Sequence, residues 1–426
     1  EPAVMRAMRN QYNPYTQVQL RLKAMEENGH LPTKIELIVI GGSWSFLPEE
    51  YKYWYIKECF RAANEYSLSV ASSIDQYTID ASKKELKKNK ESLRADLHAE
   101  QKKNEKKKYR LIGVTLETRP DFINEQEVVQ MRELGCTRVE LGVQIVDDDI
   151  LAINKRGHGV KEIAEATYLL RGCGFKITYH LMPGLPGSDF DTDYKRFKEL
   201  FEDERFQPDQ IKFYPTVVTK GSLLYEWWKQ GKYQPYSDQE LKDLIIVCKK
   251  IIPSYVRIIR LIRDIPEESI IAGNKITNLR QLIKNKGVEC RCIRCREAGK
   301  RTFERKDVKL CVQKYAAAGG EEYFLSYTSE DERTLYGFCR LRFPGQNNKF
   351  LFSSIQQAAL VRELHVYGEL ATVGEKGECV QHKGLGRELM EEAEKRAQQN
   401  GYKKMAVISG VGVRDYYRKL GYRLQD

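Results

Sequence analysis

Between Ile35 and about Ile262, short apolar runs alternate with longer segments whose apolar residues recur at helical spacing. The helix-like segments include Glu125–Leu134 and Lys161–Arg171. Strands that alternate with helices are typical of a parallel sheet with crossover helices, and the number of repeats here favours a (β/α) barrel or partial barrel over an open sheet. The predicted strands are Ile35–Gly41, Leu111–Leu116, Arg138–Gln144, Phe175–Met182, Ile211–Tyr214 and Val256–Leu261.

The pattern changes from about Leu310 onwards, where the apolar runs are those of a mixed sheet. The segment Gly384–Asn400 has the periodicity of an amphipathic helix and a glycine-rich start. The basic, cysteine-bearing stretch Cys290–Lys309 lies between the two patterns and reads as a linker. We therefore expect an α/β protein with a barrel over residues 1–280, a linker over 281–311 and a second domain over 312–426. The predicted strands of the second domain are Tyr323–Tyr327, Leu335–Phe343, Val361–Tyr367 and Lys404–Ser409.

Charge and cysteine usage narrow the class of protein. The formal net charge is +11, which favours a polyanionic partner such as nucleic acid. No apolar run approaches the roughly 18 residues of a membrane span, so we expect no membrane partner. Six of the ten cysteines are scattered singly, as expected for free thiols in the reducing cytoplasm. The lysine-rich segment from Ser82 to Lys108 fits two interpretations, a solvated helix or mobile loop and a surface that contacts phosphates.

A glycine-containing motif precedes the predicted helix of the second domain. The string from Gln381 to Arg387 has the form Q-x-x-G-x-G, with Gly384 and Gly386 as its glycines. Glycines let backbone N–H groups approach an anion closely, and the start of a helix adds the positive end of its dipole. A pyrophosphate fits such a site. The candidate residues are Lys383, Gly384, Leu385, Gly386 and Arg387.

The order of elements around this motif resembles the GNAT acetyltransferase family. A strand precedes the motif, another strand follows its helix, and the string from Arg414 to Tyr422 comes last. In that family the backbone of the preceding strand holds the thioester carbonyl of acetyl-CoA. The resemblance also implies a tyrosine close to the CoA sulfur. Tyr417 is the first candidate for it and Tyr416 the second.

Polar strings follow several apolar strands of the barrel, at the face where ligands bind in (β/α) barrels. Together they resemble the radical S-adenosylmethionine (SAM) family, which implies a SAM site. No cysteine precedes Cys59, whereas the family's iron–sulfur cluster needs three closely spaced ones. We expect either a truncated chain or a degenerate one, which binds its ligands without completing a radical step. The implied SAM-binding residues are Gly41, Gly42, Glu117, Arg119 and Gln144.

A radical SAM barrel followed by a GNAT domain resembles the catalytic subunit family of Elongator, in an archaeal or bacterial stand-alone form. The resemblance is carried by strings such as Leu116–Asp121, Asn154–His158 and Arg362–Gly368. The resemblance implies an acyltransferase that uses acetyl-CoA and a SAM-derived radical to carboxymethylate carbon 5 of the wobble uridine, in the anticodon stem-loop of tRNA. It leaves partner subunits and self-association undecided. The implied acetyl-CoA contacts are Lys34, Glu363, Leu364, His365, Val366, Leu385, Gly386, Arg387 and Tyr417, with Lys34 contributed by the barrel.

The linker carries three cysteines in the pattern C-x-C-x-x-C, namely Cys290, Cys292 and Cys295. Three thiolates this close in a basic segment suit a tetrahedral zinc site. Cys311 is the first candidate for a fourth ligand, and water or a histidine are the others. An iron–sulfur cluster is the alternative occupant.

Two other functions remain open at this point. One is a protein lysine N-acetyltransferase that keeps the barrel for recognition. The other is a catalytically inert RNA-binding module, which would bind RNA in a salt-sensitive way without turning over CoA. The barrel-face strings argue against the first, and the intact Q-x-x-G-x-G motif with Tyr417 argues against the second.

Overall fold

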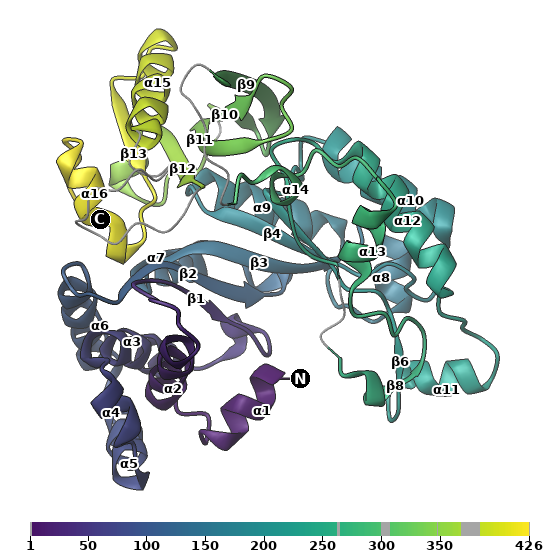
Figure 1. Ribbon diagram of the computed structural model, residues 1–426, viewed down its shortest axis with the longest axis horizontal. Helices are drawn as coiled ribbons and strands as arrows, with labels where there is room; N and C mark the ends of the chain where they lie inside the picture. The colour runs from purple at the N-terminus through teal and green to yellow at the C-terminus, as the bar shows by residue number, and fades with distance from the viewer. Residues whose placement is uncertain (1, 262–264, 300–306, 347, 368–383, 426) are drawn as a thin grey trace. The chain divides into compact units, whose positions relative to one another are not determined.

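A computed structural model describes residues 2–261, 265–299, 307–346, 348–367 and 384–425 of the chain (Figure 1). These residues form two compact units. The first unit comprises residues 1–118, 125–139 and 409–426, and the second comprises residues 119–124 and 140–408. This division differs from the predicted three parts, because the last eighteen residues belong with the beginning of the chain. Among the described helices, none is both long and apolar enough to cross a membrane.

The first unit contains two parallel strands, β1 (Lys34–Val39) and β2 (Arg110–Thr118), and the beginning of β3 (Cys136–Gln144). Helices α3 and α6 lie side by side against this part of the sheet (Figure 1). The α6 helix occupies much of the lysine-rich segment, and it buries Leu93 and Leu97. The helices of this unit are α1 (Pro2–Arg9), α2 (Pro14–Glu27), α3 (Glu49–Glu65), α4 (Leu68–Ser72), α5 (Gln76–Glu85), α6 (Lys90–Asn104), α7 (Glu125–Glu133) and α16 (Arg414–Lys419).

The second unit begins with the other half of β3 and continues the parallel sheet in the order β3-β4-β5-β7. Its strands place alternate apolar side chains, such as Ile177, Tyr179 and Ile211, in the core, where they are 0% exposed. All six strands predicted for the barrel are present. This region also contains β4 (Lys176–Leu181), β5 (Gln210–Phe213), β6 (Val218–Thr219), β7 (Arg257–Leu261), β8 (Ile270–Ala272), α8 (Asp148–Ile153), α9 (Val160–Gly172), α10 (Phe190–Glu202), α11 (Leu223–Lys229), α12 (Asp238–Ile251), α13 (Leu279–Asn285) and α14 (Ile293–Arg296).

A five-stranded sheet in the order β13-β12-β11-β10-β9 completes the second unit. The helix α15 (Leu385–Gln399) packs on it through Leu385, Leu389 and Met390 (Figure 1). The four predicted strands are β10 (Gly320–Ser329), β11 (Leu335–Phe343), β12 (Ala358–Val366) and β13 (Lys404–Val407).

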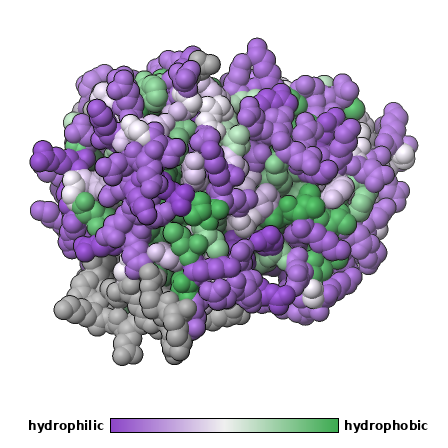
Figure 2. Space-filling model, turned by 90° about the horizontal axis from the view of Figure 1, so that it is seen from above, coloured by the Kyte–Doolittle hydropathy of each residue, from purple (hydrophilic) through white to green (hydrophobic). Residues whose placement is uncertain are grey.

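The strand β9 (Val308–Ala317) was not predicted, and it begins inside the segment expected to be a linker. It lies at the edge of the sheet beside β10, and its residues alternate between partly buried and exposed. Leu310 and Val312 are on the exposed side and Gln313 is on the inward side, so the sequence lacks the alternation of apolar and polar residues that marks a half-buried strand. Hydrophilic residues cover most of the face seen in Figure 2, with small hydrophobic patches between them.

Candidate functional site

Three predicted ligand residues of the first unit lie at the ends of β1. Lys34 opens the strand, and burial lowers the pKa of its ammonium group. Gly41 and Gly42 follow the strand with φ angles of +122° and +135°, and a Cβ atom at either position would meet nothing within 4 Å. Their backbone conformation therefore requires glycine and leaves the backbone approachable. Glu117, near the end of β2, belongs to this unit as well.

In the second unit, two of the predicted barrel-face strings meet. The Arg119 guanidinium donates to Asp121 over 2.9 and 2.7 Å. Gly157 has a φ of +72°, and a Cβ atom there would lie 2.8 Å from the same guanidinium. His158 Nδ1 lies 4.0 Å from the Asp121 carboxylate, and burial beside Arg156 lowers the pKa of its imidazole. The strings around residues 119–121 and 156–158 thus form one cluster.

The end of β3 is fixed to the segment that follows β4. Gln144 has a φ of +69°, and its carbonyl oxygen accepts a hydrogen bond from the backbone of Met182 over 2.9 Å. A non-glycine residue with positive φ is uncommon and typical of constrained sites. The structure thereby joins the predicted residue Gln144 to the segment that follows β4.

A buried polar cluster in the middle of the strands was missed by the sequence analysis. Glu140 on β3 lies 2.7 Å from His180 Nε2 on β4 and accepts a hydrogen bond from Lys212 on β5. Burial opposes the carboxylate, but the bond with His180 and the charge of Lys212 lower the pKa of Glu140 to about 2. The cluster lies within the strands, whereas the predicted ligand residues lie at strand ends. The available signal was an ionisable residue between two apolar ones, for example Lys212 between Ile211 and Phe213.

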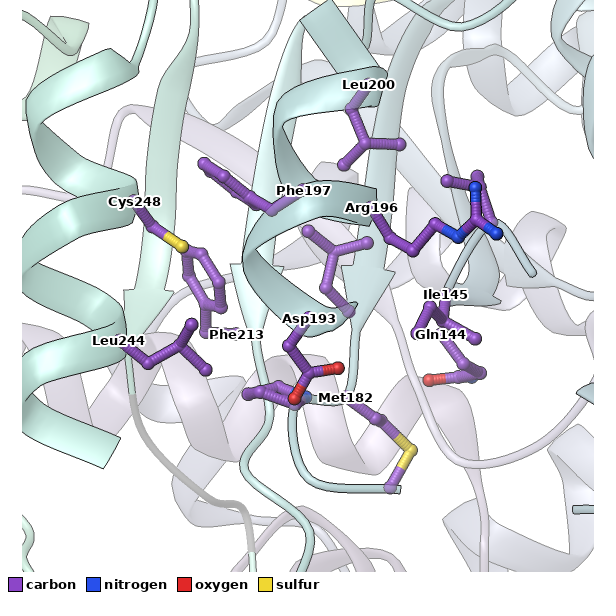
Figure 3. Close-up of a pocket in the computed structure, with 13 residues that line it drawn as sticks. Gln144, Ile145, Met182, Asp193, Arg196, Phe197, Leu200, Phe213, Leu244 and Cys248 are labelled. Carbon is purple, nitrogen blue, oxygen red and sulfur yellow. The ribbon is translucent and has the colours of Figure 1, made fainter. Parts of the chain in front are cut away.

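A small pocket lies between the ends of these strands and helices α10 and α12 (Figure 3). Its walls are mainly apolar, and Asp193 and Gln144 lie at one end of it. The Asp193 carboxylate accepts hydrogen bonds from the backbone of Gly184 (2.7 Å), from Ser188 Oγ (2.6 Å) and from the Tyr236 hydroxyl (2.7 Å). Asp193 therefore holds the loop after β4 rather than a ligand.

The predicted anion site at the start of α15 has the expected backbone. Gly384 precedes the helix with a φ of +82°, a left-handed conformation that favours glycine. Leu385 is fully buried against the sheet, so the first turn, which contains Gly386 and Arg387, is held in place. The first N–H groups of a helix have no intrahelical acceptors and can bind an anion. Lys383 lies outside the described residues.

The predicted thioester strand, β12, contains a bulge. Arg340 pairs with Glu363 and Leu341 with Val361, so Arg362 has no residue opposite it. The Glu363 carboxylate accepts from Arg340 Nε over 2.9 Å and lies 3.5 Å from Lys176 Nζ, and these cations lower its pKa to about 2 despite burial. Its side chain is therefore already engaged. Any contact of Glu363 with acetyl-CoA falls to the backbone, as it does in an oxyanion-type arrangement.

Leu364, His365 and Val366 complete this strand, and the ring of His365 stacks on Phe338 with the centroids 5.9 Å apart. The two candidate tyrosines, Tyr416 and Tyr417, lie on α16 in the first unit, with their ring centroids 5.2 Å apart.

The structure brings together three of the four predicted metal ligands. The sulfur atoms of Cys290, Cys292 and Cys295 lie within 4.8 Å of one another. Hydrogen bonds from the other two thiols and the charge of Lys249 lower the pKa of Cys295, as suits a thiolate ligand. Cys311 is not part of this group. It lies on β9, where its sulfur is 3.2 Å from the Thr328 hydroxyl, so the prediction that it is the fourth ligand is not supported.

Family models match most of the chain. The radical SAM superfamily matches residues 22–197, the radical SAM C-terminal domain matches residues 208–287, and the acetyltransferase (GNAT) domain matches residues 377–426. These matches confirm the predicted partial barrel followed by a GNAT domain, in the order found along the chain.

Proteins of known name resemble nearly the whole chain. It is 42% identical over 435 residues to the tRNA uridine(34) acetyltransferase of Methanocaldococcus jannaschii, covering 99% of this chain and 75% of that protein. It is 42% identical over 433 residues to the protein of the same name from Dehalococcoides mccartyi, covering 99% and 88%. It is 38% identical over 435 residues to Elongator complex protein 3 of Homo sapiens, covering 100% and 75%.

A solved structure has the same fold. The archaeal Methanocaldococcus infernus Elp3 with its N-terminal residues 1–46 deleted superposes with a TM-score of 0.85 at 40% sequence identity. The match covers 100% of this chain and 95% of that one.

Proposed function

Because the chain belongs to the family of the tRNA uridine(34) acetyltransferases and Elongator complex protein 3, we propose that it uses acetyl-CoA to modify carbon 5 of the wobble uridine of tRNA. Its GNAT domain and its relatives make the chain an acyltransferase. The observation that carries the proposed substrate is the 42% identity over 99% of the chain, which spans the barrel and the GNAT domain alike. We propose that the product is a tRNA with a carboxymethyl group on this carbon.

Acetyl-CoA is implied by the GNAT match, and the described residues fit it. We assign the pyrophosphate to the first turn of α15, with Gly384, Leu385, Gly386 and Arg387. The bulged end of β12, from Glu363 to Val366, would hold the thioester carbonyl through backbone N–H groups. Tyr417 is assigned to the CoA sulfur, with Tyr416 as the second candidate, and Lys34 and Lys383 complete the proposed contacts.

The radical SAM match implies SAM and an iron–sulfur cluster, which when bound supply a radical able to abstract a hydrogen atom from a methyl group. Gly41, Gly42, Glu117, Arg119 and Gln144 are the residues proposed to hold SAM. The described cysteines of the first unit are Cys59 and Cys136 alone, and both are buried, so they do not provide the three ligands of a cluster. We assign binding of the ligands and hydrolysis of the thioester to the residues of this chain.

We propose zinc as the occupant of the cysteine group at Cys290, Cys292 and Cys295, because three thiolates at this separation suit a tetrahedral site. A water molecule or a histidine would supply the fourth ligand. The metal content of the purified protein, compared with that of Cys292→Ser, tests this assignment.

The substrate surface we propose is the anticodon stem-loop of tRNA, bound in the cytoplasm. The net charge of +11 supports a nucleic-acid partner. The target base would have to leave its stack to reach an enclosed site.

The decisive experiment measures CoA release from acetyl-CoA by the full chain, with and without tRNA, together with Tyr417→Phe. We expect release that depends on tRNA and falls about 100- to 1000-fold in the variant, the range typical of one lost catalytic hydrogen-bond donor. Acetylation of a protein instead of tRNA-dependent release would favour a lysine acetyltransferase. Tight RNA binding without any release would favour an inert binding module.

A further inference from the structure

The segment that carries the two candidate tyrosines belongs to the first unit. β13 ends at Val407, and from Ser409 onwards the chain belongs to the first unit, together with β2, α6 and α7. The other GNAT elements that the structure describes, β9 to β12 and α15, belong to the second unit. The position of Tyr417 is therefore set by residues outside the GNAT sheet.

Two glycines allow this segment to approach β2 closely. A Cβ atom at Gly410 would lie 1.9 Å from the carbonyl oxygen of Ile112, and one at Gly412 would lie 2.7 Å from the Cβ atom of Arg110. No larger residue fits at either position without moving the strand. Arg132 on α7 adds a hydrogen bond of 3.0 Å to the carbonyl oxygen of Ser409. The segment that leads into α16 is thus fixed to β2 and α7.

The helix α16 itself is held by one carboxylate. Glu105, which follows the last residue of α6 and is 6% exposed, accepts from Arg414 Nη1 over 2.9 Å and lies 2.8 Å from Arg418 Nη1. Arg414 and Arg418 are four residues apart, so they project from the same side of α16 and flank Tyr416 and Tyr417 in sequence.

The backbone next to Glu105 is held in place by hydrogen bonds. The neighbouring Asn104 is fully buried, donates to the carbonyl oxygen of Tyr109 over 3.0 Å and accepts from the backbone of Leu111 over 2.8 Å. The end of α6 is thereby tied to the start of β2, and Glu105 presents its charge from a fixed position. Charge-assisted hydrogen bonds from two arginines to a shielded carboxylate are strong and directional.

We propose that Glu105 is a positioning residue for Tyr417: by binding Arg414 and Arg418 it fixes α16 to the end of α6 in the first unit, so that the tyrosine proposed to serve acetyl-CoA depends on residues outside the GNAT sheet for its place. The kinetic consequence rests on the proposed function, whereas the structural consequence does not. If Tyr417 moves by a fraction of the length of a hydrogen bond, the reaction becomes slower although acetyl-CoA still binds.

The test compares Glu105→Gln with Asp415→Asn in the full chain. Glu105→Gln keeps the shape of the side chain and removes its charge. Asp415→Asn is the matched control, because it removes only the more exposed partner of Arg418, at 2.5 Å. Hydrogen exchange is followed at the amides of Leu420, Gly421 and Tyr422, which bond to carbonyl oxygens of α16. We expect their exchange to rise about tenfold in Glu105→Gln and to stay unchanged in the control. Unchanged exchange in Glu105→Gln overturns the proposal, whatever the activity of the enzyme.

Measurements of enzyme kinetics provide a second test of the proposal. We expect tRNA-dependent CoA release by Glu105→Gln to fall about tenfold in kcat with the KM for acetyl-CoA unchanged. The double variant Glu105→Gln/Tyr417→Phe should be no slower than Tyr417→Phe alone, because Glu105 acts through that tyrosine. Effects that multiply, or a loss of rate that only follows the fraction of unfolded protein in a thermal melt, overturn the positioning role. Absence of release in the unmodified chain would instead count against the proposed function, and the exchange measurement would still decide the role of Glu105.

Discussion

At the scale of single residues, the cluster of Glu140, His180 and Lys212 shows how a charge is kept inside the sheet. Glu140 is fully buried, and its ionised form persists because Lys212 and His180 contact it directly. A buried ion pair is weak evidence for net stability, but removing one partner leaves the other charge without compensation.

We predict that Glu140→Gln lowers the free energy of unfolding by about 3–5 kcal/mol at pH 7, because Lys212 then remains buried without its counter-ion. The folded-state pKa of Glu140 is about 2, below its ordinary value of 4.5. A depressed carboxyl pKa stabilises the fold above the ordinary value and loses that contribution as the pH falls towards the folded value. The difference between the two proteins in urea unfolding should therefore be largest above about pH 4.5 and shrink between pH 4.5 and 2.

The matched control for this prediction is Glu165→Gln. Glu165 pairs with Lys161 on the exposed face of α9, with both side chains more than half exposed. Its replacement should change the unfolding free energy by less than about 0.5 kcal/mol at any pH. An equal loss of unfolding free energy in both variants would mean that the buried cluster makes no specific contribution to stability.

At the scale of elements, the bulge in β12 is held by an ion pair from the barrel region of the same unit. Arg362, the bulged residue, donates to both oxygens of Asp209 over 2.6 and 2.9 Å, and both side chains are fully buried. Arg171 and Arg340 lie 3.6 and 3.4 Å from the same carboxylate. Asp209 is thus the shared anion of three arginines, one of which lies in the proposed thioester strand.

We predict that Asp209→Asn costs about 3–5 kcal/mol of folding free energy and also weakens the binding of acetyl-CoA, because the bulge loses one of its two carboxylate partners and keeps only Glu322. Urea unfolding and calorimetric titration with acetyl-CoA measure the two effects. Asp203→Asn serves as the control, since Asp203 pairs with the exposed Arg205. A destabilised Asp209→Asn protein that binds acetyl-CoA with its original Kd would show that the bulge does not depend on this pair.

The barrel strands were predictable because their apolar residues recur at strand spacing, as Val139, Leu141 and Val143 do, and helical segments separate them. The strand β9 was not, because its exposed side carries the apolar Leu310 and Val312 and its inward side carries Gln313, which breaks the expected alternation. The anion site at α15 was found from its glycines, which are a local signal. The cluster at Glu140 and the arginines around Asp209 join residues far apart in sequence, so a local pattern could mark single members but could not show which residues meet.

At the scale of the whole molecule, the net charge of +11 does not show which of the cations are available to a polyanion. Several lysines of the lysine-rich segment already have anionic partners. Lys88 lies 2.6 Å from Glu85 and 2.9 Å from Asp96, and Lys90 is paired with Glu49. The helical structure therefore separates this segment into neutralised positions and exposed cations, a distinction that its composition alone could not make.

If this surface contacts tRNA, the exposed cations should carry the salt dependence of binding. Lys102 and Lys106 are exposed and form no ion pair with any residue that the structure describes. We predict that replacing both by alanine weakens tRNA binding and reduces the slope of log K against log salt by about two, one for each lost phosphate contact. Lys88→Ala/Lys90→Ala is the matched pair on neighbouring positions, and it should change the slope less because these lysines already neutralise carboxylates. Binding isotherms over a series of salt concentrations measure both slopes. Equal slopes for the two double variants and the unmodified protein would place the tRNA surface elsewhere on the molecule and leave the lysine-rich segment as a solvated helix.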